Sequence, residues 1–382
     1  MEHKYVFDKI DELNGQYIRI WEDVCNLESP TEEKERVDAV GAYFIKMAQS
    51  RGWEIEIEEY EQAGNAICIT MNPRSDARPV SISGHIDTVH PVGLFGEPPV
   101  TMDTEKIYGP GVMDCKGGVV AGFLAMDALF QCGFTDRPVQ LIIQTDEESN
   151  SRQSQMKSVE FMCRKAKNAI AFLNTEGGYG DTAVLIRKGI LRYRFIVSGV
   201  STHASCCPEG ASAIAEAAHK ILELEKMKDM ESLTCNVGVI KGGTVSNTVP
   251  DWCEFLIDIR FANQQGCEKA EKIVENVAQT THIPGCSCQT ERISIRPAMP
   301  LCDKNIALLE KMNEIYEKTG LPHLTMRAEP SGSDAAYTTL ADIPTVDNVG
   351  VYGDRIHSKD EFAYLESLAE AAKRYAAVAM YI

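Results

Sequence analysis

The sequence predicts an α/β protein with a mostly parallel sheet and a smaller α+β domain inserted into it. Short apolar strands alternate with amphipathic helices over the first half of the chain. From Lys188-Gly189 the predicted order becomes strand, helix, strand, strand, helix, strand, as in ferredoxin-like domains, and after Arg296-Pro297 the first pattern resumes. We therefore predict a discontinuous first domain over residues 1–187 and 297–382, with the inserted domain over residues 188–296.

Hydrophobic periodicity and turn residues place the elements of the first domain. Ser29-Pro30-Thr31-Glu32 is typical of a helix stop followed by a capping box. Helices are expected over Tyr5–Leu27, from the capping box to about Ser50, and over 119–130, 305–318 and 361–382. Strands are expected over 53–58, 66–71, 79–83, 138–145 and 169–174. Within the inserted domain, strands are expected over 190–197, 234–240, 251–260 and 287–295, with helices over 211–226 and 268–279.

Composition limits the classes of partner and compartment. The 382 residues carry a formal net charge of −18, which argues against nucleic acid or an anionic membrane surface as a partner. The N-terminal stretch lacks a signal-peptide core, and no apolar run reaches eighteen residues. Thirteen cysteines without a CxxC pair favour free thiols over a disulfide framework. We expect a cytoplasmic protein.

Acidic and imidazole side chains follow the predicted strands. They are His85 and Asp87, Asp114, the pair Glu147-Glu148, and Glu176, with His357 before the last helix. In an open α/β sheet, ligands bind beyond the carboxyl ends of the strands, so these groups should converge there. Two imidazoles and three carboxylates suit a pair of divalent cations, with zinc preferred and one carboxylate shared. Asp87 lies on the same strand face as His85 and would orient its ring.

The Glu147-Glu148 pair suggests a division of labour. Neighbouring side chains on an extended segment point in opposite directions, so one carboxylate can bind metal while the other transfers protons. Each feature alone has an ordinary alternative. His85 is then a structural histidine, the glutamate pair a solvated loop, and Asp114 a helix N-cap. Their joint placement at the strand ends favours the metal site.

Four motifs resemble the co-catalytic dinuclear zinc peptidases of the M20 family, and the resemblance spans almost the whole chain. They are Gly84-His85-Ile86-Asp87-Thr88-Val89, Tyr108-Gly109-Pro110-Gly111-Val112-Met113-Asp114-Cys115-Lys116-Gly117-Gly118, Thr145-Asp146-Glu147-Glu148 and Ser331-Gly332-Ser333-Asp334-Ala335-Ala336-Tyr337. They look closest to the glutamate carboxypeptidase branch. The family often has Asp where Cys115 stands, and it often has a cis peptide bond after the bridging Asp.

The resemblance implies a role for each matched position. One zinc would be held by His85, Asp114 and Glu176, and the other by Asp114, Glu148 and His357. Co2+ and Mn2+ are alternatives to zinc. Glu147 would be the general base that activates a metal-bound hydroxide. This reading implies cleavage of an amide bond by a metallopeptidase.

The inserted domain carries further family marks. His203 resembles the histidine that stabilises the oxyanion, often from the partner of a homodimer formed through this domain. Asn247 and Arg260 look like the substrate-binding pair, with Arg260 offering a fork to a carboxylate. Ser331 and Gly332 are expected in a loop that binds the substrate carboxylate. Without the family, these residues would be a loop histidine, a turn residue, a surface cation and a polar turn.

The sequence therefore predicts a carboxypeptidase acting on small peptides or N-acyl amino acids. The alternatives are an N-acyl amino acid deacylase, of the acetylornithine deacetylase or succinyl-diaminopimelate desuccinylase type, and a non-catalytic zinc-binding dimerisation module. A serine hydrolase is disfavoured because no G-x-S-x-G elbow occurs. A thiol nucleophile at Cys206 lacks an orienting motif.

Overall fold

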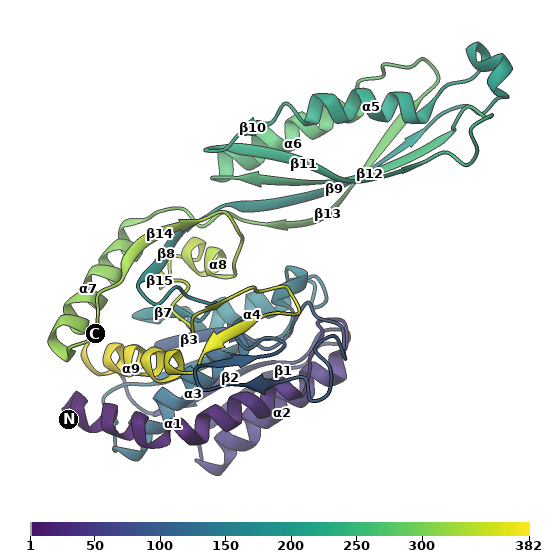
Figure 1. The fold of residues 1–382 in the computed structure, drawn as a ribbon. Coiled ribbons are helices and arrows are strands. Elements are labelled where there is room, and N and C mark those ends of the chain that lie inside the picture. Colours follow the sequence, from purple (N-terminus) through teal and green to yellow (C-terminus); the bar gives the residue numbers. More distant parts are fainter. Residues whose placement is uncertain (1) are drawn as a thin grey trace. The chain divides into compact units, whose positions relative to one another are not determined.

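The computed structural model describes residues 2–382, which divide into two compact units (Figure 1). Unit 1 comprises Met1–Leu185, Leu301–Ala328 and Ser333–Ile382, and unit 2 comprises Ile186–Pro300 and Glu329–Gly332. The segment with Ser331 and Gly332 thus groups with unit 2, whereas the sequence placed it in the first domain. The reason is local, because Arg187 Nη1 donates to Ser331 Oγ at 2.8 Å.

A six-stranded sheet forms the centre of unit 1, in the order β1-β2-β6-β3-β7-β15. The pairs β6–β3, β3–β7 and β7–β15 are parallel, while β1–β2 and β2–β6 are antiparallel. The predicted α/β class with a mostly parallel sheet is confirmed. The strands are β1 (Glu54–Glu58), β2 (Ala66–Met71), β3 (Val80–His85), β6 (Val139–Gln144), β7 (Ala171–Asn174) and β15 (Thr345–Val346).

Helices cover both faces of this sheet. One face packs on α1, α2, α3 and α9 around Trp21, Phe44 and Phe123, and the other packs on α4 around Phe161 and Phe172. Alternating residues of β2 and β6 enter the two cores in turn, as a strand buried on both faces requires. The helices of unit 1 are α1 (His3–Asn26), α2 (Lys34–Ser50), α3 (Lys116–Gln131), α4 (Lys157–Ala166), α7 (Asp303–Thr319), α8 (Ala335–Leu340) and α9 (Glu366–Tyr381).

Short strands connect the segment that carries His357 to the segment that carries Asp114. The sheet order is β16-β17-β5-β4, and Phe362 on β17 is the pairing partner of Tyr108 on β5. The prediction of a helix from Glu361 is wrong at its start, because residues 362–364 pair as a strand and α9 begins at Glu366. These strands are β4 (Thr101–Met102), β5 (Lys106–Tyr108), β16 (Gly353–Asp354) and β17 (Phe362–Tyr364), and a separate pair is β8 (Thr182–Arg187) with β14 (Thr325–Glu329).

Unit 2 has an antiparallel sheet in the order β10-β11-β12-β9-β13, and its core contains side chains from two helices. Apart from the two-residue β10 and a 3-10 helix over Ala204–Glu209, the chain order is strand, helix, strand, strand, helix, strand, as the sequence indicates. The elements are β9 (Gly189–Ser198), α5 (Ala213–Leu224), β10 (Lys228–Asp229), β11 (Leu233–Gly242), β12 (Trp252–Phe261), α6 (Gln264–Gln279) and β13 (Ser287–Arg296). Over residues 2–382, no helix is both long enough and apolar enough to cross a bilayer.

Candidate metal-binding active site

The register of the parallel strands aligns the segments that carry the predicted site residues. His85, the last residue of β3, pairs with Gln144, the last residue of β6. Ser83 pairs with Asn174, the last residue of β7. Glu147 and Glu176 therefore follow their strands at the same edge as His85. This is the edge beyond the carboxyl ends of parallel strands, where α/β proteins bind ligands.

Asp114 lies between the two predicted imidazole ligands. Its Oδ1 is 3.1 Å from His85 Nε2, and its Oδ2 is 3.2 Å from His357 Nε2. Each carboxylate oxygen therefore faces a different ring. This arrangement suits a carboxylate shared by two cations, because one oxygen is available to each of them.

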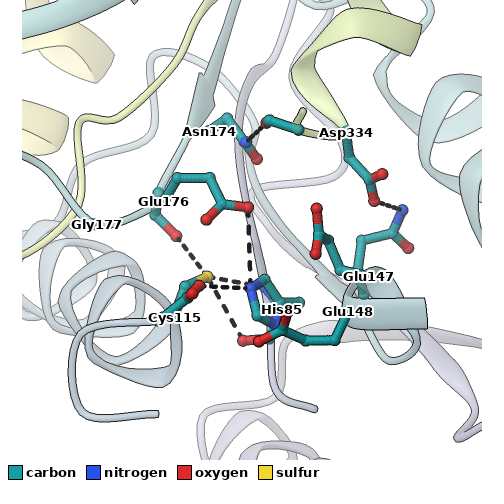
Figure 2. Close-up of polar contacts among 12 residues, drawn as sticks. His85, Cys115, Glu147, Glu148, Asn174, Glu176, Gly177 and Asp334 are labelled. Atoms are coloured by element: carbon teal, nitrogen blue, oxygen red, sulfur yellow. Dashed lines mark hydrogen bonds and ion pairs between the residues drawn. The ribbon is translucent and has the colours of Figure 1, made fainter. Parts of the chain in front are cut away.

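Two further carboxylates flank the histidines. Glu176 Oε1 is 3.9 Å from His85 Nε2, and Glu148 Oε2 is 3.3 Å from His357 Nε2. Figure 2 shows the side chains of Glu176, His85 and Glu148 gathered around one small region. His85, Asp114 and Glu148 form one group whose ligand atoms all lie within 4.8 Å of one another. The structure thus brings together all five residues predicted as metal ligands.

The cluster holds more acidic groups than its two imidazoles balance. Burial, followed by the charge of Asp114, raises the pKa of Glu148 to about 8. Burial and the charge of Glu147 raise the pKa of Glu176 well above its ordinary value. Hydrogen bonds to Asp114 and Glu148 raise the pKa of the half-exposed His357 to about 11. Buried carboxylates are paired or coordinate metals, so this donor set fits divalent cations.

Asp87 contacts both the ring of His85 and the segment that carries Glu147 and Glu148. Its Oδ1 is 3.3 Å from His85 Nδ1, although that nitrogen lies 3.0 Å from the carbonyl oxygen of Asp87. The same carboxylate accepts the backbone N–H groups of Glu147 and Glu148, both at 3.2 Å. Thr31 Oγ1 also donates to it at 2.7 Å. This completely buried carboxylate therefore fixes the segment that carries the glutamate pair.

Two local predictions are wrong at this edge. Glu147 and Glu148 are not on an extended segment, because Glu147–Ser149 form a 3-10 turn that closes at Asn150. Their side chains diverge because of this turn and not because of strand alternation. The capping box predicted at Ser29-Pro30-Thr31-Glu32 does not form, because α2 has Glu33 at its N-cap and no side-chain cap. The Thr31 hydroxyl is held instead by Asp87, which lies far away in the sequence.

Cys115 is buried where the resemblance often has Asp, and its peptide bond to Asp114 is cis. The N–H of His85 donates to Cys115 Sγ at 3.1 Å, so the thiol contacts the backbone of the metal-ligand strand. Gly84 leaves room for this contact, because a Cβ there would lie 3.0 Å from the sulfur and 2.3 Å from Thr175 Oγ1. Burial raises the pKa of the Cys115 thiol to about 12, which keeps it protonated at neutral pH.

The other predicted site residues lie in unit 2. His203 and Asn247 are adjacent, because His203 bridges to Thr248 and the N–H of Ala204 donates to the carbonyl of Asn247. Arg260 on β12 is paired with Asp258, its Nε lying 2.6 Å from Oδ1. Arg192 binds the other oxygen of the same carboxylate at 2.9 Å. The sequence did not single out Arg192 or Asp258.

The sequence also missed Glu361, which is 1% exposed and accepts hydrogen bonds around Asp114. Its neighbours come from segments about 250 and 270 residues away in the chain. In the sequence, Asp360-Glu361 looks like a pair of surface acids at the start of a predicted helix. A buried position next to the metal loop becomes visible only through the pairing of β17 with β5.

The family model described as peptidase family M20/M25/M40 matches residues 81–381. This chain belongs to that family. The match includes every predicted metal ligand, so the resemblance noted on four motifs is confirmed over most of the chain. Membership in M20 makes this protein a metal-dependent peptidase or amidohydrolase.

Individual relatives within M20 are distant. Carboxypeptidase G2 from Pseudomonas sp. (strain RS-16) is 26% identical over 365 residues, covering 94% of this chain and 87% of that protein. Succinyl-diaminopimelate desuccinylase from Rickettsia felis is 26% identical, covering 68% of this chain and 73% of that protein. The crystal structure of aminopeptidase PepT from Bacillus cereus ATCC 10987 matches with a TM-score of 0.75 at 22% identity, covering 96% and 98% of the chains. The structural match shows a shared fold.

Proposed function

We propose that this chain is a dinuclear zinc hydrolase that cleaves an amide bond next to a free carboxylate, as a carboxypeptidase does. One observation carries the proposal. The two oxygens of Asp114 face His85 and His357 separately, at 3.1 and 3.2 Å. A site for a single cation would not need a shared carboxylate between two imidazoles. The carboxypeptidase assignment is supported by the similarity to carboxypeptidase G2 over almost the whole chain.

The cluster supplies ligands for both proposed zinc ions. Asp114 would be shared, His85 and Glu176 would complete one site, and Glu148 and His357 would complete the other. Bound zinc polarises a carbonyl and lowers the pKa of water, which is the chemistry that amide hydrolysis needs near neutral pH. Co2+ and Mn2+ accept the same mixture of imidazole and carboxylate ligands.

Glu147 is the proposed general base. Its side chain is 8% exposed, so it is largely withdrawn from bulk water, and its backbone N–H is held by Asp87. A carboxylate in this position accepts a proton from the attacking water and returns it to the leaving amine. Asp87 contributes by fixing the turn that directs Glu147, so it positions the base without touching the substrate.

His203 is proposed to stabilise the oxyanion, and its hydrogen bonds define the tautomer. The backbone N–H of Ser205 donates to His203 Nδ1 at 3.2 Å. Because Nδ1 accepts this bond, the hydrogen of the neutral ring lies on Nε2. An exposed Nε2–H is the donor that a developing negative charge on the carbonyl oxygen requires.

The free carboxylate of the substrate is proposed to bind at Arg260 and Asn247, with contributions from Ser331 and Gly332. Arg260 already forms two contacts with Asp258, at 2.6 and 3.3 Å. These contacts fix the orientation of the guanidinium plane, and its other N–H groups are suited to a second carboxylate. A small peptide or an N-acyl amino acid provides such a group.

A deacylase of N-acyl amino acids is the second candidate. A deacylase hydrolyses the same kind of amide bond and binds the same free carboxylate of the substrate. The similarity to succinyl-diaminopimelate desuccinylase supports this alternative. The two differ in the acyl group, so a substrate panel separates them.

We also propose that the protein forms a homodimer through unit 2. Within residues 2–382, β10 pairs with only Leu233 and Thr234 of β11, and the N–H groups of Cys235 and Val237 donate to the Met227 carbonyl and to Glu225, so the edge has no strand partner after Val237. Val239 and Ile240 on β11 are 43% and 53% exposed. An open edge with exposed apolar side chains favours pairing with a second copy. Analytical ultracentrifugation of the wild type and of Ile240→Lys tests this, and a wild-type monomer would refute it.

The decisive experiment is a hydrolysis panel with purified protein. Peptides ending in glutamate, leucine or lysine and N-acetyl or N-succinyl amino acids are assayed after zinc loading and after treatment with a chelator. We expect cleavage of substrates with a free carboxylate, loss with chelator, and recovery with zinc. Cleavage of the matching amidated peptides at the same rate would contradict the carboxylate requirement.

A further inference from the structure

Glu361 accepts four hydrogen bonds inside unit 1. Its Oε1 accepts the backbone N–H groups of Met113 at 2.9 Å and Asp114 at 3.1 Å. Its Oε2 is 3.0 Å from His90 Nε2 and accepts the N–H of Gly111 at 3.3 Å. Both oxygens are thus occupied by donors, which is the environment that a buried carboxylate requires.

These contacts join three segments that carry site residues. His90 follows His85 and Asp87 on the segment after β3, and Gly111 to Asp114 form the loop that ends in the shared carboxylate. Glu361 itself follows His357 by four residues, and its carbonyl accepts the N–H of Gly109 at 3.2 Å. One side chain and its own backbone therefore connect the loops of His85, Asp114 and His357.

We propose that Glu361 is a positioning residue that sets the place of Asp114 relative to His357. The inference rests on the proposed function in that the pair binds metal. The N–H of Asp114 belongs to the same residue as the shared carboxylate, so a shift of this hydrogen bond moves the carboxylate. Groups behind metal ligands fix ligand orientation in this way, and their loss typically weakens metal binding by about 10- to 100-fold.

Asp87 holds another loop of the cluster by its backbone in the same way. Asp87 accepts the N–H groups of Glu147 and Glu148, as Glu361 accepts those of Met113 and Asp114. Each completely or almost completely buried carboxylate holds a loop by its backbone, and that loop carries a proposed ligand.

Glu216 in unit 2 provides the matched control. It is also 1% exposed, and its Oε2 accepts two backbone N–H groups, from His282 at 2.9 Å and Ile283 at 2.7 Å. It differs in belonging to unit 2, which carries no predicted metal ligand, and in its ion pair with Lys220 at 3.0 Å. Glu216→Gln therefore reports what loss of a buried carboxylate does to stability alone.

The experiment measures zinc affinity of the metal-free full-length protein by competition with a fluorescent chelator. In Glu361→Gln an amide N–H replaces one acceptor and faces N–H donors, so we expect zinc affinity to fall by about 10- to 100-fold. We expect Glu216→Gln to bind zinc as the wild type does while its thermal unfolding temperature falls. At saturating zinc, Glu361→Gln should lower kcat with KM unchanged, since no substrate-binding group is altered.

The outcomes separate the inference from the proposed function. Wild-type protein that binds no zinc refutes the function, whereas tight wild-type binding with an unchanged Glu361→Gln affinity overturns the positioning role. Circular dichroism verifies that each variant is folded. If Glu361→Gln does not fold, Glu361→Asp keeps the charge but withdraws it by one methylene, and it should weaken zinc binding by about tenfold. Wild-type affinity in a folded Glu361→Asp would equally overturn the role.

Discussion

Asp114 in unit 1 and Glu216 in unit 2 are both buried carboxylates that face basic side chains, but their surroundings differ. Glu216 is paired with one lysine, Lys220 at 3.0 Å, and both side chains are 1% exposed. Lys220 Nζ also donates to the carbonyls of Val277 at 2.7 Å and Thr280 at 2.6 Å, at the end of α6. Asp114 instead shares two imidazoles with several other acids.

The balance of buried charges distinguishes a structural ion pair, at Glu216, from a candidate metal site, at Asp114. In unit 2 one negative and one positive group balance, and backbone groups satisfy the remaining positions, so the pair joins α5 to α6. In unit 1 the acids exceed the bases, which raises the pKa of Glu148 through burial and the charge of Asp114. Such an imbalance is relieved by protonation of a carboxylate or by added positive charge. The predictions below test this contrast.

The largest effect is expected from Glu147→Gln, which removes the proposed base but leaves every proposed ligand. We expect kcat to fall by about 10²- to 10⁴-fold, because the amide side chain no longer accepts the proton. Zinc content, measured by atomic absorption, should equal that of the wild type. Glu160→Gln, on the exposed face of α4, is the control and should keep full activity. Retained activity in Glu147→Gln would refute the role.

Lys220→Met should have the next largest effect, because it leaves Glu216 buried without its counter-charge. Breaking a buried ion pair costs about 3–5 kcal/mol, and the loss should appear in urea unfolding of unit 2. Lys226→Met is the matched control, since Lys226 pairs with Glu223 on the surface and is 67% exposed. Equal stability of the two variants would show that the Glu216–Lys220 pair does not stabilise unit 2.

Zinc should stabilise the imbalanced region and not the balanced one. At a free concentration of 100 times Kd, a ligand that binds only the folded state adds about 2.7 kcal/mol to the free energy of unfolding. Hydrogen exchange followed by mass spectrometry assigns the protection to peptides. We expect slower exchange near Asp114 and His357 and unchanged exchange in α5 and α6. Uniform protection of both regions would contradict the contrast.

A smaller effect is expected at Asp127, a balanced carboxylate within unit 1. Burial raises its pKa, but hydrogen bonds from Arg51 and Tyr17 outweigh burial and lower it below the ordinary value of 3.8. Its stabilisation is therefore complete above about pH 5 and is lost as pH falls through the lowered pKa. Asp127→Asn should cost about 2 kcal/mol at pH 7, and the difference from the wild type should shrink toward pH 3. A pH-independent difference in urea unfolding would exclude this role of ionisation.

Sequence reasoning could identify candidate site residues where they directly follow buried strands. His85, Asp114, the Glu147-Glu148 pair and Glu176 could be grouped because buried strands are short, apolar and followed by turn residues. The family resemblance then assigned Glu148 and His357 as ligands. The mostly parallel sheet of unit 1 and the order of strands and helices in unit 2 followed from the same periodicity. Local pattern was sufficient for these features because each strand and each helix is amphipathic or fully buried.

Long-range pairing set the limit of prediction. The contact of Thr31 with Asp87, the 3-10 turn at Glu147 and the burial of Glu361 depend on loops meeting at one edge of the sheet. Local pattern assigned Ser29-Pro30-Thr31-Glu32 to a capping box and Glu361 to a helix start. Both assignments follow ordinary propensity, and tertiary contacts override them. The residues that support a site are therefore harder to predict than those that form it.

The order of the ligands along the chain has a consequence for biosynthesis. His85, Asp114, Glu148 and Glu176 precede unit 2, whereas His357 and Glu361 follow it. A ribosome therefore synthesises four proposed ligands and all of unit 2 before it adds the fifth ligand. Any product truncated before residue 357 lacks the His357 imidazole and the hydrogen bonds of Glu361. Such incomplete chains carry the acidic cluster without the complete set of proposed ligands.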